Sequence, residues 1–165
     1  MAGMSRLKTV LQAIDDFNRQ DPHGRELPFS ERLTGWVLKL NPQASEPLRI
    51  AARGQHIGRW TVPRNTYPMD KPGYLRWRED LKRFHAKTVV DLMAQAGYSE
   101  EDQAQTRTII LKKYQVDADA QTIEDALCLE FLEFGLLAFR IKETEEKMID
   151  ILRKSWKKMS EKGRA

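Results

Sequence analysis

Two of the three histidines of the chain lie in its most basic and most aromatic stretch. His56 stands in "ARGQHIGRW" and His85 in "LKRFHAK". Imidazole titrates near neutral pH, transfers protons and binds metals. On the helix expected around His85, Arg78 and Lys82 are spaced to share its face at i, i+4 and i+7. Such a polar face favours a catalytic or ligand-binding site; the alternative is that the histidines are structural residues whose hydrogen bonds are satisfied within the fold.

The positive charge of the chain is concentrated around these histidines. The net charge is +4, yet residues 49–87 hold ten Lys and Arg against three acids. A segment of this kind favours an anionic partner such as phosphate, a nucleotide, sulfate or nucleic acid. Arginine and lysine can clamp phosphate oxygens, and the expected anion-binding residues are Arg53, Arg59, Arg64, Arg78 and Lys82. The simpler alternative is a solvated helix face beside a basic loop.

A basic, aromatic loop is expected at about residues 59–73, where three prolines interrupt the chain. Loops of this length inside a compact domain are usually functional or mobile. Trp60, Tyr67 and Trp77 lie in or near it and can stack on a base or close the loop over a pocket.

Asp125 is the carboxylate whose position most needs an explanation. Its neighbours at i+3, i+4 and i+7 are apolar, and a buried carboxylate needs a cation, a metal or backbone donors. One interpretation is a metal site; the other is a capping box with Thr122 at the start of a helix. Glu124 could exchange roles with Asp125.

A divalent metal is the cofactor that these residue types could hold. Histidine and carboxylate ligands suit Mn, Fe, Zn or Ni, and Mg is a further possibility. The candidate ligands are His56, His85, Asp125 and Glu31, from four separate segments. Spacing alone does not bring them together.

The apolar residues recur with helical spacing nearly throughout, and no segment alternates as a half-buried strand does. The sequence therefore predicts an all-α, single compact domain over residues 1–165, with about seven helices. A long helix is expected over 74–96, and Ser45 and Ser99 are expected to cap the starts of two further helices. The segment 117–139 is apolar around most of its circumference and is expected to be the central buried helix.

Several classes of protein do not fit the chain. No apolar run approaches the roughly 20 residues of a membrane span, and the first residues lack the apolar core of a secretory signal. We therefore expect a cytoplasmic protein with no membrane partner. The single cysteine, Cys128, excludes an internal disulfide and a multi-thiolate zinc site.

Two short motifs resemble the signatures of class I aminoacyl-tRNA synthetases. "HIGRW" at 56–60 is similar to HIGH, and "KMSEK" at 158–162 is similar to KMSKS. In those enzymes the first motif follows a strand of a Rossmann-type fold. Because no strand is expected here, we interpret both matches as coincidence.

A wider resemblance covers about residues 6–165. "SERLTGWVLKL", "LRIAARGQHIGRWTVPRNTYPMDKPGYLRWREDLKRFHA", "IEDALCLEFLE" and "IDILRKSWKKMSEKGRA" resemble the family of domain of unknown function 4202. Its members sometimes carry a glutamyl-tRNA synthetase label. The family name implies no activity.

The layout of that family in turn looks like a remote form of the HD superfamily of helical, metal-dependent phosphohydrolases. "LRIAARGQHIG", "FHAKTVVDLMAQAGYS" and "EDALCL" are similar to its ligand-bearing helices. Carried over by position, the resemblance implies His56, His85 and Asp125 as metal ligands in an HD-like helical bundle. Gln55 stands where the histidine of the His-Asp pair should be, and Glu31 falls near the place of the first histidine.

Three functions follow as hypotheses. The first is an HD-like phosphohydrolase of a nucleotide or other phosphorylated small molecule, with His56, His85 and Asp125 as catalytic residues. The alternative is a non-catalytic anion- or nucleotide-binding module with a degenerate metal site, which Gln55 favours. The third, RNA binding through the basic loop and the C-terminal "RKSWKKMSEKGR", predicts affinity that falls steeply with salt.

Overall fold

Short polar side chains begin the helices that position the site. In the computed structural model, which describes residues 3–112 and 117–165, Ser45 accepts a hydrogen bond from the first turn of α3 (Glu46–Arg53). Ser99 does the same for α5 (Glu100–Leu111), as the sequence indicated. Asp70 accepts from Gly73 N at 2.7 Å and begins α4 (Lys71–Gln95). These contacts satisfy amides that a helix leaves without partners.

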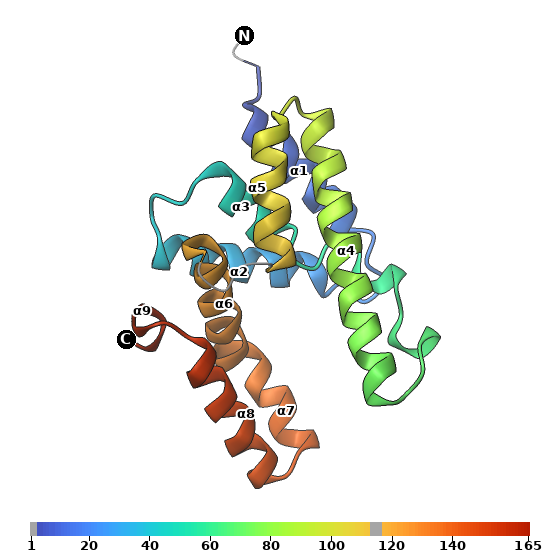
Figure 1. Ribbon diagram of the computed structural model, residues 1–165, viewed down its shortest axis with the longest axis vertical. Helices are drawn as coiled ribbons and strands as arrows, with labels where there is room; N and C mark the ends of the chain where they lie inside the picture. The colour runs from blue at the N-terminus through green and yellow to red at the C-terminus, as the bar shows by residue number, and fades with distance from the viewer. Residues whose placement is uncertain (1–2, 113–116) are drawn as a thin grey trace.

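The body of the molecule is a helical bundle in which α1 (Arg6–Asn18), α3, α5 and the upper half of α4 gather above α2 (Glu26–Leu40) (Figure 1). Helix α4 packs along α5, and α2 packs against α3 and α6 (Ala118–Glu130). The core between them consists of aliphatic side chains with no exposed surface. Its largest members include Ile14, Leu33, Leu48, Ile50, Ile57, Met93, Ile109, Ile110 and Ile123.

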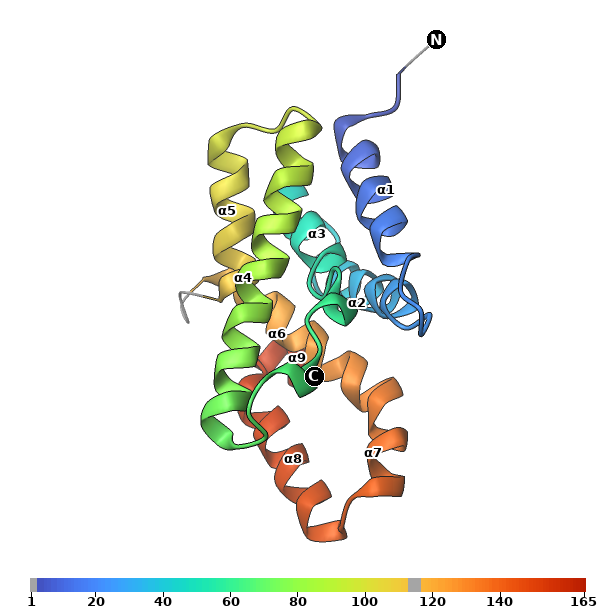
Figure 2. The ribbon, with the colours of Figure 1, turned by 90° about the vertical axis from the view of Figure 1, so that its right-hand side faces the viewer.

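The C-terminal part projects away from this bundle. Helix α6 continues through a π-helical turn, η3 (Phe131–Gly135), into α7 (Leu136–Lys142), and α8 (Glu145–Lys158) returns beside it. The short α9 (Glu161–Arg164) follows. Figures 1 and 2 both show α7 and α8 as a hairpin below the bundle, with the lower half of α4 on one side.

The predicted all-α class is confirmed. The described residues form nine α-helices, eight of them with seven residues or more, and no strand. Among the same residues, no helix is both long enough and apolar enough to cross a membrane.

The segment between α3 and α4 is packed down rather than extended into solvent. It forms two short 3-10 turns, η1 (Arg59–Thr61) and η2 (Arg64–Thr66). Trp77 Nε1 of α4 donates to Val62 O at 2.8 Å, and Tyr67 donates to the Asp80 carboxylate at 2.7 Å. These bonds hold the second half of the segment against α4.

Two helix predictions need correction. Helix α4 begins at Lys71 rather than Tyr74, because Asp70 caps it and Pro72 fits its first turn. The segment 117–139 is not one buried helix: α6 is buried, but Phe134 and Leu137 are 59% and 65% exposed. Apolar residues around the circumference therefore do not mark a core beyond Glu130.

Candidate functional site

A cavity of about 460 Å³ lies between the segment after α3, the first half of α4 and the α6–α8 region. Its volume is in the range of small-molecule sites. The polar residues of its wall are Gln55, His56, Arg59, Tyr74, Arg78, Lys82, His85, Lys112, Glu124, Ser155 and Lys158. Its apolar wall consists of Leu81, Leu127, Cys128, Phe131, Phe139 and Ile151.

The wall carries far more positive than negative charge. Arg59, Arg78, Lys82, Lys112 and Lys158 line it together with one carboxylate, Glu124. Glu124 is already engaged, since Lys112 Nζ lies 3.1 Å from its Oε2. The cavity therefore presents an excess of cationic groups.

Burial makes the charge of two of these cations, Arg59 and Lys112, costly. It lowers the pKa of Arg59, and the positive charge of Arg78 lowers it further. It also lowers the pKa of Lys112, which the pairing with Glu124 partly restores. Cations that desolvation already disfavours gain most from an anion beside them.

His85 is held in one tautomer by the backbone. Its Nδ1 donates to the carbonyl oxygen of Ile57 at 2.7 Å, because a carbonyl can only accept. Nε2 is therefore left as an acceptor. Burial lowers the pKa of His85 to about 4, so the ring is neutral at pH 7. As the i, i+4, i+7 spacing predicted, Arg78, Lys82 and His85 all line the cavity.

His56 lies beside His85, with 5.9 Å between the ring centroids. The ring of Phe29 stacks parallel to that of His56, with 4.3 Å between the ring centroids. Burial lowers the pKa of His56 well below its usual range, and Arg59 and His85 lower it further. The two histidines are thus a pair of neutral imidazoles at one cationic wall.

Behind His56 lies a carboxyl group that the sequence reasoning did not identify. Glu26, in the first turn of α2, has its Oε2 3.9 Å from His56 Nδ1. Burial raises the pKa of Glu26 to about 7. Among the described residues, this buried oxygen has no hydrogen-bond partner. Glu26, His56 and Arg59 also line a second cavity of about 540 Å³.

Asp125 is buried, as expected, but neither it nor its hydrogen-bond partners line the ligand cavity. Its carboxylate accepts from Ser160 N at 2.7 Å, from the Ser160 hydroxyl and from Gln121 Nε2 at 3.0 Å. The capping-box interpretation is wrong, because α6 begins earlier, with Asp117 as its cap. Asp125 instead anchors the segment after α8 to α6.

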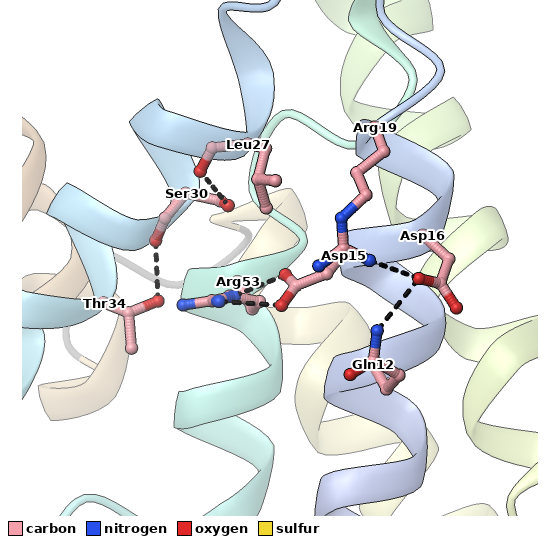
Figure 3. A network of polar contacts seen from close by, with 8 residues as sticks. All are labelled: Gln12, Asp15, Asp16, Arg19, Leu27, Ser30, Thr34 and Arg53. Carbon is pink, nitrogen blue, oxygen red and sulfur yellow. Dashed lines mark hydrogen bonds and ion pairs between the residues drawn. The ribbon is translucent and has the colours of Figure 1, made fainter.

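Two other predicted site residues also lie outside the wall of the cavity. Arg53 forms a bidentate pair with Asp15 of α1, with distances of 2.6 and 2.8 Å (Figure 3). Its guanidinium therefore joins α3 to α1. Glu31, the fourth metal candidate, is exposed on α2.

The remaining predicted residues lie in the loop or, in the case of Trp77, beside it on α4. Arg64 donates to Tyr67 O, Pro68 O and Asp70 O, which closes the loop on itself. Trp60 packs near Phe17, and Trp77 is buried under Arg59, 5.3 Å from its guanidinium carbon. Neither these two tryptophans nor Tyr67 lines the main cavity. Tyr74, Phe131 and Phe139 are the aromatic residues that do.

A metal-binding cluster is not formed by the residues that the structure describes. Within 3–112 and 117–165, no three His, Cys, Asp or Glu side chains gather closely enough to share an ion. The two imidazoles are close, but Asp125 is occupied by Ser160 and Glu31 is exposed. The set His56, His85, Asp125 and Glu31 does not fit a common metal.

Sequence reasoning missed Lys112 as a wall residue, named Glu124 only as a substitute for Asp125, and included Lys158 only in the basic C-terminal segment. Lys112 caps the end of α5 in the left-handed backbone conformation, with φ of 53°. This conformation is unusual for a residue other than glycine. Lys158 comes from the last turn of α8. Their separate positions in the chain gave no signal, because only the packing of α5, α6 and α8 unites them.

No curated protein and no solved structure matches the chain. A family model does match, over residues 8–165, and its description is domain of unknown function (DUF4202). This range contains both histidines, all five cations of the wall and the Asp125–Ser160 contact. The chain therefore belongs to the DUF4202 family.

Proposed function

We propose that this protein binds a small, phosphate-containing anion in the main cavity. The observation that carries the proposal is the gathering of Arg59, Arg78, Lys82, Lys112 and Lys158 around one carboxylate that is already paired. Charge-assisted hydrogen bonds to phosphate are among the strongest polar contacts in proteins. The anion supplies the negative charge that the wall lacks.

The other wall residues define the rest of the ligand. His85 Nε2 can accept a hydrogen bond from a hydroxyl group of the ligand, because its Nδ1 is committed to Ile57. Phe131, Phe139 and Leu127 offer apolar surface beside the cations. A nucleotide or another phosphorylated compound with an apolar ring suits this combination better than free phosphate does.

Calorimetric titration tests the proposal directly. Pyrophosphate and AMP should bind the purified chain, and Arg78→Gln or Lys82→Gln should each weaken binding about tenfold or more, since a hydrogen bond to a charged group contributes roughly 1.5–3 kcal/mol. Arg76→Gln is the matched control, because Arg76 lies on the same helix, is exposed and lies outside the described wall of the cavity.

Two results would contradict the proposal. If Arg76→Gln weakens binding as much as Arg78→Gln does, the attraction is a general effect of surface charge. If a mixed-sequence oligoribonucleotide binds far more tightly than AMP, and steeply loses affinity with salt, RNA is the partner and the small-molecule proposal fails.

Hydrolysis of the bound phosphate is a second candidate, and the pair of neutral imidazoles supports it. A neutral His85 Nε2 facing the cavity can accept a proton from an attacking water, which is the task of a general base. The same cations would stabilise charge on the phosphoryl oxygens. An HD-like arrangement of the helices is part of this candidate.

Because the described carboxylates do not fit a shared metal with the histidines, no step of this candidate is assigned to an ion. A screen with p-nitrophenyl phosphate and common nucleotides, run with EDTA and with added Mn²⁺, tests it. His85→Gln, which keeps a donor for Ile57 O, should abolish any turnover while pyrophosphate still binds. Turnover that survives this substitution would remove His85 from the reaction.

A further inference from the structure

Helix α8 has an apolar face that the described chain does not cover. Ile149, Leu152 and Trp156 are spaced i, i+3 and i+7 and are 42%, 38% and 55% exposed. They line a shallow groove of about 320 Å³ together with Arg153 and Lys157. The ligand cavity uses a different face of the helix, that of Ile151, Ser155 and Lys158. We call the stripe of Ile149, Leu152 and Trp156 the outer face of α8.

A row of four exposed charges runs beside the outer face. It consists of Glu146, Asp150, Arg153 and Lys157, with two acids followed by two bases at spacings of four, three and four residues. The helix dipole favours acids in the first turn and bases in the last. That effect is confined to the ends and does not explain the order of Asp150 and Arg153 in the middle of the helix.

The order of the four charges is instead that of a self-complementary surface. The row is symmetric about its midpoint, with the sign of the charge reversed. If two copies of α8 lie antiparallel, Glu146 is opposite the partner's Lys157, and Asp150 is opposite the partner's Arg153. Two-fold symmetry makes each pair occur twice. The same alignment places Leu152 close to its own copy at the two-fold axis and Ile149 within two residues of the level of the partner's Trp156.

We propose that the outer face of α8 pairs antiparallel with the outer face of a second copy of the chain. The hairpin of α7 and α8 projects from the bundle (Figures 1 and 2), so the bundles can lie at opposite ends of the pair. Trp156 is steadied by Arg164, whose guanidinium carbon lies 5.0 Å from its ring. The inference does not depend on the proposed ligand.

Charge-reversed variants test the pairing. Glu146→Lys with Asp150→Lys makes the row wholly basic, and Arg153→Glu with Lys157→Glu makes it wholly acidic. Sedimentation velocity over a wide range of concentration should show the wild type in equilibrium between monomer and dimer. Each variant alone should remain monomeric, because its like charges face each other. A mixture of the two should form a heterodimer, and one chain with all four changes should again form a homodimer.

Glu100→Lys with Glu101→Lys on α5 is the matched control, since both residues are exposed and the change of charge is the same. It should dimerise as the wild type does. Circular dichroism of each variant reports whether α8 still folds, and restoration in the mixture or in the fourfold variant cannot come from an unfolded helix. A wild type that stays monomeric at every concentration overturns the proposal, as do variants that dimerise unchanged.

Discussion

At the scale of single residues, the carboxyl groups of Asp125 and Glu26 are accommodated in the fold in opposite ways. Asp125 receives three hydrogen bonds, two of them from Ser160. Glu26 has an oxygen that no described residue contacts by hydrogen bond, and burial raises its pKa to about 7. Asp125 is therefore a structural anchor. Glu26 is a proton-holding group beside His56 at the edge of the candidate site.

Glu26→Gln should stabilise the fold by an amount that grows with pH. Between the usual carboxyl pKa of 4.5 and about pH 7, folded Glu26 keeps a proton that unfolded Glu26 loses. The wild type therefore loses stability as pH rises through this window, by up to about 3 kcal/mol. Gln stays neutral, so its advantage should rise between about pH 5 and pH 7 and then level off.

Urea unfolding of both proteins across this pH range measures the difference. His85, whose folded pKa of about 4 lies below its usual value, gains stability with rising pH in the wild type and in the variant alike, so it cancels. Glu31→Gln, an exposed change on the same helix, should show no such trend. An advantage of Gln that is constant with pH would place the Glu26 pKa near its ordinary value.

Arg53→Met should weaken the fold and leave anion binding unchanged. Its guanidinium pairs with Asp15 in a partly buried contact. Removing the guanidinium leaves the Asp15 carboxylate unpaired, at a cost of about 2 kcal/mol or more. The melting temperature and the pyrophosphate affinity are the two measurements. A loss of affinity with an unchanged melting temperature would instead return Arg53 to the anion-binding set.

This distinction between arginines shows what the sequence can predict at this scale. The shared face of Arg78, Lys82 and His85 follows from helical spacing alone, and the structure confirms it. The role of Arg53 does not, because its partner Asp15 lies 38 residues earlier in the chain. Likewise, Arg64 binds loop carbonyls, and no side-chain pattern indicates a bond to a backbone oxygen.

At the scale of elements, the C-terminal helix α9 is held on α6 through a close contact. A Cβ added to Gly163 would lie 2.7 Å from Asp125 Cγ and 2.9 Å from its Oδ1. Gly163→Ala should therefore push α9 off α6, expose residues 159–165 to hydrogen exchange and lower stability by about 1–2 kcal/mol, as overpacking does.

Gly35→Ala provides the matched control, since no atom lies within 4 Å of the added Cβ in the middle of α2. Alanine there should raise stability by up to about 1 kcal/mol, because glycine is a poor helix former. If Gly163→Ala leaves exchange at the C-terminus unchanged, α9 is not anchored by Asp125.

The prediction of elements succeeded for helix starts, which depend on nearby residues, and failed for burial, which depends on the neighbouring helices. The caps Ser45 and Ser99 lie within three residues of the amides that they bind. In contrast, the apolar segment 117–139 is covered only as far as α6, because the bundle ends there and η3 and α7 continue beyond it (Figure 1). Hydrophobic pattern cannot show where the covering helices stop.

At the scale of the whole molecule, the candidate site joins the bundle to the projecting hairpin. Arg59, Arg78 and His85 belong to the bundle, whereas Phe139 and Lys158 come from α7 and α8. This union of distant segments could not be predicted from the sequence, since it depends on how α6 directs the hairpin back toward α4. A ligand in the cavity would touch both parts at once.

Ligand binding should therefore protect the hairpin as well as the bundle. At a pyrophosphate concentration 100 times its dissociation constant, the bound state gains about 2.7 kcal/mol, which for a chain of this length corresponds to a rise of roughly 5–10 °C in melting temperature. Hydrogen exchange followed by mass spectrometry should slow in α8 and at the end of α5, because Lys158 and Lys112 close on the anion. In Arg78→Gln, whose affinity is expected to be about tenfold lower, the same concentration of pyrophosphate should stabilise the fold by only about 1.4 kcal/mol, so the rise in melting temperature should be roughly halved. Protection confined to α4 would mean that the anion sits on the bundle alone and that the hairpin takes no part in the site.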